Sequence, residues 1–76
     1  MGWNLEGMWV SALYMGEYPV SGRVESSRVR YGGEVQHTVI LDTPIQFRWR
    51  AEPALRLLVE HRFVQQVRYL NKESTV

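Results

Sequence analysis

Residues 19 to 42 read Pro-Val-Ser-Gly-Arg-Val-Glu-Ser-Ser-Arg-Val-Arg-Tyr-Gly-Gly-Glu-Val-Gln-His-Thr-Val-Ile-Leu-Asp, and this stretch decides the fold. Val, Thr, Tyr and Ile dominate both of its halves, as is typical of strands in a half-buried sheet. Gly32 and Gly33 separate the halves, and a glycine pair between alternating runs indicates a β-hairpin. The stretch therefore predicts a long hairpin with its tip at these glycines.

The apolar positions change phase within the first half of this hairpin. Val20 and Val24 occupy even positions, whereas Val29 and Tyr31 occupy odd ones. One extra residue near residues 26–27, a β-bulge, would restore the phase and bend the strand strongly.

Two registers are compatible with the glycine tip. A two-residue turn places His37 opposite Arg28, and a three-residue loop over residues 32–34 places it opposite Val29. The second register keeps one face apolar, so it is the one we predict.

The rest of the chain favours further short strands. Residues 8–15 are apolar, and residues 45–50 and 55–60 alternate between apolar and polar side chains, so each range predicts a strand. Residues 63–70 fit a strand or a helix, and the strand is preferred because strands precede it. Residues 1–7 fit one short helical turn or an extended arm. The sum is an all-β domain over residues 1–70, with a polar tail at 71–76.

Composition excludes several kinds of site. With 76 residues the chain makes one domain, and with no cysteine it has neither disulfides nor thiolate metal sites. Its two histidines lack an acidic cluster nearby, so we expect no metal and no cofactor. The 45% apolar content is generous for this length, which suggests that some of it is buried between subunits.

Charge and hydropathy limit the kinds of binding partner that we expect. The formal net charge is only +1. Eight of the nine basic residues are Arg, which suits phosphate binding or tight interfaces. A compositional bias of the source genome explains the high share of Arg equally well. No apolar run approaches the roughly 20 residues of a membrane helix, and no secretory signal is visible. We therefore expect a cytoplasmic protein without a membrane partner.

Catalysis has little support in the sequence. Neither a serine nucleophile nor paired carboxylates occur in a recognisable setting, and Asp42 fits a strand-end turn better than a catalytic acid. Gly32 and Gly33 lack the lysine and helix of a phosphate-binding loop. We predict that the protein is not an enzyme and has no catalytic residues.

Several residues could instead form a nucleic-acid surface. Arginines can neutralise phosphates, and aromatic or histidine rings can stack on bases. The candidates are Arg28 and Arg30 before the turn, His37 after it, Trp49 with its flanking arginines, and Arg62. Each of them taken singly also fits a solvated outer face or an apolar core.

The layout resembles the Sm-like family, small RNA-associated barrels that assemble into rings, and in particular its small phage-encoded members. The resemblance covers residues 8 to about 70 and depends on Gly22-Arg23-Val24 in the bent strand and on His-Thr-Val-Ile-Leu-Asp at 37–42. It implies a five-stranded Sm-like or SH3-like barrel with a strongly bent second strand.

The same resemblance implies roles for individual residues. His37 takes the base-stacking position, Thr38 the position of a base-contacting Asn, and Arg62 that of a loop Arg. The sequence departs from the family at Thr38, which replaces Asn, and at Phe63, which follows Arg62 where the family has Gly; the segment 45–50 has no counterpart in the family.

The expected function is therefore a non-enzymatic module that forms a homo-oligomeric ring and binds RNA or single-stranded DNA. The candidate nucleic-acid-binding residues are His37, Thr38, Arg62, Arg28, Arg30 and Trp49. The alternative is an SH3-like interaction module that docks a host or partner protein.

Overall fold

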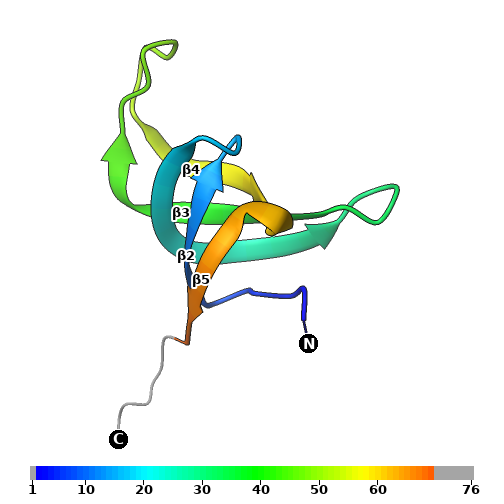
Figure 1. Cartoon of the computed structure of the whole chain (residues 1–76). Helices are drawn as coiled ribbons and strands as arrows, with labels where there is room; N and C mark the ends of the chain where they lie inside the picture. The colour runs from blue at the N-terminus through cyan, green and yellow to red at the C-terminus, as the bar shows by residue number, and fades with distance from the viewer. Residues whose placement is uncertain (1, 70–76) are drawn as a thin grey trace, which may run out of the picture.

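The computed structural model describes residues 2–69, which form one antiparallel sheet of five strands (Figure 1). The strands are β1 (Trp9–Tyr14), β2 (Tyr18–Val29), β3 (Val35–Ile45), β4 (Ala54–Glu60) and β5 (Val64–Arg68), with a 3-10 turn, η1 (His61–Phe63), before the last. Their order in the sheet is β4-β3-β2-β1-β5, so β4 and β5 are the two edges. The predicted all-β class is confirmed.

The central hairpin is confirmed, but both registers considered for it are wrong. Val29 lies opposite Val35 and His37 lies opposite Ser27, which leaves a five-residue loop over residues 30–34. Gly32 and Gly33 have φ values of 96° and 89°, a region that glycine adopts easily, and they let the loop close. Val29 is 50% exposed in the observed register, so it does not belong to the apolar face on which the prediction placed it.

The predicted bulge in β2 is present, at residue 25 and not at residues 26–27. The register shifts between Val24 and Ser26, so Glu25 is the extra residue that has no partner on β3. Bulges increase local twist and bend the strand, and Figure 1 shows β2 curving strongly around the other strands. Gly22 lets β2 approach β3 closely, because a Cβ there would overlap the backbone carbonyl of Ile40.

The core lies on the concave side of this curved sheet. Its residues come from all the strands except β5, from the N-terminal segment and from the loop after β3, and β1 also contacts β4. Valines supply most of the fully buried volume, which agrees with the β-branched composition of the strands. The buried apolar residues are Leu5, Val10, Ala12, Val20, Val24, Val39, Leu41, Phe47, Ala54, Leu57 and Val59.

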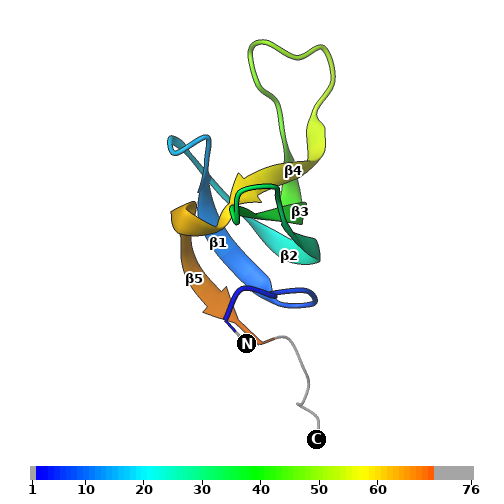
Figure 2. The ribbon, with the colours of Figure 1, turned by 90° about the vertical axis from the view of Figure 1, so that its right-hand side faces the viewer.

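The strand predicted at residues 45–50 is wrong. β3 ends at Ile45, and residues 46–53 form a loop, here called the finger loop, that projects beyond the sheet (Figure 2). The Gln46 side-chain amide closes this loop by donating to the carbonyls of Phe47, at 3.0 Å, and Arg50, at 2.7 Å. Alternation alone predicted a strand, but no neighbouring strand within the described residues pairs with this segment.

The other predicted strands are present where the structure describes them. β1 and β4 lie where strands were predicted, and the ambiguous segment after Phe63 is the strand β5. The N-terminal segment from Gly2 to Gly7 forms turns and no helix, and the tail at 71–76 lies outside the described residues. Within residues 2–69, no helix has the length and apolar character needed to cross a membrane.

Candidate nucleic-acid interface

The outer face of β2, β3 and β4 is set by their register. Val24, Val39 and Leu57 form one row across the three strands and point into the core. Side chains alternate along a strand, so the adjacent rows point outward. One outer row joins Ser26, Thr38 and Leu58.

A groove opens on this outer face close to the hairpin tip. It has a volume of about 570 Å³ and is lined by Arg28, Arg30, Gln36, Thr38 and Leu58, which we call the outer groove. The register accounts for this set, because Arg28 lies opposite Gln36 and Thr38 lies opposite Leu58. Three of the predicted site residues, Arg28, Arg30 and Thr38, are thus brought together.

The arginines of the outer groove are available to a ligand. In the part of the chain from residue 2 to 69, the salt bridges join Arg56 to Glu25, at 3.4 Å, and Arg62 to Glu60, at 2.7 Å. Neither Arg28 nor Arg30 has a carboxylate partner there, and both are exposed. The groove therefore presents two uncompensated positive charges beside an amide and a hydroxyl.

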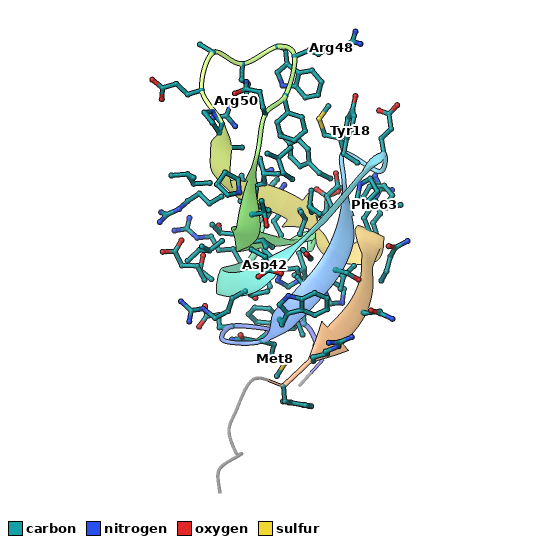
Figure 3. The ribbon with its side chains drawn as sticks, turned by 90° about the vertical axis from the view of Figure 1, so that its left-hand side faces the viewer. Met8, Tyr18, Asp42, Arg48, Arg50 and Phe63 are labelled. Carbon is teal, nitrogen blue, oxygen red and sulfur yellow. The ribbon has the colours of Figure 1, made fainter. Side chains whose placement is uncertain are left out.

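Arg62 lies outside the outer groove. It lines a smaller hollow of about 220 Å³, together with residues of the hairpin tip and His61. Its guanidinium lies 4.8 Å from the centre of the Phe63 ring in a cation–π contact, in addition to its salt bridge with Glu60. The Phe63 ring in turn packs over the backbone of Gly16 in the β1–β2 turn, and Figure 3 shows it beside that turn.

His37 is not at the surface. It has no exposed area and lies in the core opposite Ser27 and Val59. Its Nδ1 is 2.7 Å from Ser27 Oγ and its Nε2 is 2.8 Å from His61 Nδ1. In this arrangement the ring cannot stack on a base, so the base-stacking role implied for it by the resemblance does not fit its position.

The buried histidine belongs to a polar network. Ser27 Oγ accepts a hydrogen bond from the Leu5 backbone N–H at 3.1 Å, and the Ser27 N–H donates to Glu6 Oε2 at 3.1 Å. Burial, followed by the charge of His61, lowers the pKa of His37 from 6.5 to about 4. The ring is therefore neutral near pH 7, and it ties the N-terminal segment, β2, β3 and η1 together.

Trp49 lies in the finger loop, away from the outer groove. It is 55% exposed, and its ring is stacked on the buried Phe47 ring at 4.7 Å between centroids and 20° between planes. The Tyr18 ring, at the start of β2, lies 5.5 Å from the Trp49 ring, measured between the ring centroids. Figure 3 shows Tyr18 and Arg48 at the same end of the molecule.

The prediction that Asp42 is a strand-end turn residue is wrong, because Asp42 lies within β3, three residues before that strand ends at Ile45. Asp42 Oδ2 accepts hydrogen bonds from the Trp9 indole, at 2.7 Å, and from the Ser21 hydroxyl, at 3.1 Å. The carboxylate thereby connects β1, β2 and β3 on the surface of the sheet, which Figure 3 shows facing the viewer.

Sequence reasoning missed Gln36 and Leu58 as groove residues, and Tyr18 and His61 as partners of other predicted residues. Gln36 follows from the correct register, because it lies opposite Arg28. Tyr18 and His61 meet their partners only through the fold, and no local pattern marks them.

No group of three or more potential metal ligands occurs among the residues that the structure describes. Comparison of the chain with protein-family models, curated proteins and solved structures gave no match.

Proposed function

We propose that this protein is a non-enzymatic module that binds single-stranded nucleic acid through the outer groove. One observation carries the proposal: Arg28 and Arg30 line the same groove as Gln36 and Thr38, without carboxylate partners in the described chain. Guanidinium groups fork onto phosphate oxygens, and Arg is the preferred residue for phosphate recognition.

The other groove residues suit the rest of a nucleotide. The Gln36 amide and the Thr38 hydroxyl can each donate and accept hydrogen bonds, as contacts to sugars and base edges require. Leu58 offers apolar surface to the side of a base, and it is 56% exposed. The outer groove therefore offers positive charge, hydrogen-bonding groups and apolar surface close together on one face of the sheet.

The charge of the whole chain is too small to attract nucleic acid by itself, because the formal net charge is +1. The attraction is local to the groove, and few phosphates are neutralised by one copy. For two phosphate contacts on a single strand, the slope of log K against log salt concentration is about −1.4. A single copy of the protein is therefore expected to bind a nucleic-acid strand with modest affinity.

Self-association supplies additional affinity. The sheet ends in two edge strands, β4 and β5, whose outer backbone groups are free to pair with another chain. Exposed apolar residues lie on both edges: Leu55 and Leu58 on β4, and Val67 on β5. Pairing the β4 edge of one copy with the β5 edge of the next is a head-to-tail contact, which closes into a ring if the rotation permits. Several grooves on one assembly bind a strand with higher avidity.

The test is fluorescence anisotropy with labelled RNA and DNA oligonucleotides of about 12 nucleotides, within the range of known single-strand site sizes. Arg28→Gln with Arg30→Gln is expected to weaken binding and to make the salt slope less steep by about 1.4. The matched control compares Arg28→Gln alone with Arg23→Gln, since each removes one charge and Arg23 lies outside the groove.

Equal losses in Arg28→Gln and Arg23→Gln would show a diffuse charge effect and reject the groove. Absence of binding to either oligonucleotide at low salt would reject the function. Light scattering on the same samples reports the mass of the assembly. A monomer at every concentration would reject the ring. The outer groove would then still be tested by the arginine variants.

A further inference from the structure

The finger loop lies away from the hairpin tip (Figures 1 and 2), and residues of this loop and of the start of β2 line a second concave site. It has a volume of about 480 Å³, and Tyr18, Pro19, Phe47, Arg48 and Trp49 are among its lining residues. We call it the aromatic pocket. The proposed function assigned above does not use it.

The rings of this pocket are held in place before any ligand arrives. Phe47 is buried, and it contacts Tyr14 at 5.4 Å and Tyr18 at 5.7 Å between ring centroids. Trp49 stacks on Phe47, and the Gln46 amide fixes the turn that carries both. Rings fixed in this way lose little conformational entropy on binding, yet more than half of the Trp49 side chain remains exposed.

The charges beside the pocket indicate which flat ligand it takes. Arg48 lines the pocket and Arg50 follows Trp49, and both are exposed. In the described part of the chain neither arginine lies within salt-bridge distance of a carboxylate. Figure 3 shows Arg48 at the end of the finger loop, directed away from the sheet. A planar ring with an adjacent negative charge matches this combination, and a nucleotide carries both.

We propose that the aromatic pocket takes one nucleobase of a bound single strand, stacked on Trp49, with the adjoining phosphate on Arg48. This inference depends on the proposed function, since it adds a base site to the phosphate contacts of the outer groove. The two sites lie at different ends of the molecule, so an oligonucleotide too short to reach both contacts only one of them. A proline-containing peptide is the competing occupant, because aromatic grooves also bind extended proline-rich segments.

The test uses the full chain labelled with 5-fluorotryptophan and observed by fluorine NMR. The protein has three tryptophans, Trp3, Trp9 and Trp49, and Trp49→Phe assigns the pocket signal. Titration with a thymidine or uridine trinucleotide is expected to shift the Trp49 signal and to leave the Trp3 and Trp9 signals in place. A proline-rich peptide is titrated in parallel.

Affinity measurements complete the test. Trp49→Ala is expected to weaken binding of a long oligonucleotide about tenfold or more, and Trp49→Phe to retain most of it, because any aromatic ring can stack. Trp3→Ala is the control, since Trp3 is exposed and lies outside the pocket.

The outcomes separate this inference from the proposed function. If the outer-groove variants weaken oligonucleotide binding and Trp49→Ala does not, the base site is wrong and the function stands. If no oligonucleotide binds, both are wrong. If the peptide shifts the Trp49 signal and the trinucleotide does not, the pocket is a peptide site and the inference is overturned.

Discussion

His37 Nε2 and His61 Nδ1 lie 2.8 Å apart, where η1 contacts the inner side of β3. A hydrogen bond between two ring nitrogens contains one proton, so one ring donates and the other accepts. A proton on both facing nitrogens would set two N–H groups against each other. Since His37 is fully buried, a charge on its own ring would also have no contact with water.

This pair predicts how stability depends on pH. The pKa of His37 is about 4 in the folded protein and 6.5 as a free side chain, so the unfolded chain binds more protons between these values. The free energy of unfolding therefore falls as the pH falls through this window, by at most about 1.4 kcal/mol per pH unit and about 3 kcal/mol in all. Urea unfolding at a series of pH values measures this slope.

His37→Gln is the control for that slope, because it removes the titrating group and retains a side chain that can form hydrogen bonds. The variant is expected to lose this part of the pH dependence. An NMR titration of the His37 ring in the unaltered protein is a direct check, and a midpoint near 6.5 would contradict the prediction.

Ser27→Ala is expected to destabilise the protein by about 1–3 kcal/mol, because the Leu5 N–H and His37 Nδ1 would both lose a buried partner. Ser26→Ala is the matched control on the outer face of the same strand, with an expected change within about 0.5 kcal/mol. Chemical denaturation compares the two, and faster exchange of the Leu5 amide would locate the effect. Equal changes in both variants would speak against the network.

Gly22→Ala is expected to cost about 3 kcal/mol or more, because the added Cβ would overlap the Ile40 carbonyl and come within 2.9 Å of Leu41 Cα, both in the backbone. Gly33→Ala meets no atom within 4 Å but has a φ of 89°, so its cost is about 1–2 kcal/mol. Gly2→Ala has neither problem and is expected to be neutral. Thermal or urea unfolding ranks the three, and a neutral Gly22→Ala would show that the strands do not approach so closely.

Asp42→Ala is expected to cost about 1 kcal/mol, because the Trp9 indole and the Ser21 hydroxyl would lose their shared acceptor at an exposed site. Asp42→Asn keeps one acceptor oxygen and should recover part of this loss. Unfolding experiments measure the cost, and the signal of fluorine-labelled Trp9 reports the lost hydrogen bond. An unchanged Trp9 signal in Asp42→Ala would contradict the assignment.

Local sequence signals predicted much of the fold. The strands around Gly32 and Gly33 and the bulge in β2 follow from periodicity and turn residues, whereas the strand after η1 was preferred only because strands precede it. The register failed because it was chosen to keep Val29 and Tyr31 on the apolar face. In the structure both side chains are exposed, while the polar pair Ser27 and His37 is buried through its own hydrogen bonds.

The candidate site was harder to predict. Arg28, Arg30 and Thr38 share a face both in the true register and in the predicted one, which differ by two residues, whereas the two-residue turn would have put Thr38 on the other face. Trp49 was placed on a strand because alternation looks the same with or without a pairing partner. The contact of His37 with His61 joins residues 24 positions apart, and it depends on how η1 returns to the sheet.

The extra residue in β2 has a consequence for the length of the chain. Val24 faces Val39 and Ser26 faces Thr38, so a protein lacking Glu25 alone would keep every cross-strand neighbour of this ribbon. It would lose only the kink, and with it the side chain that meets Arg56. Deletion of this one residue would thus keep the register of β2 against β3 and remove the bend. The residues that align the two strands are therefore different from the residue that curves them.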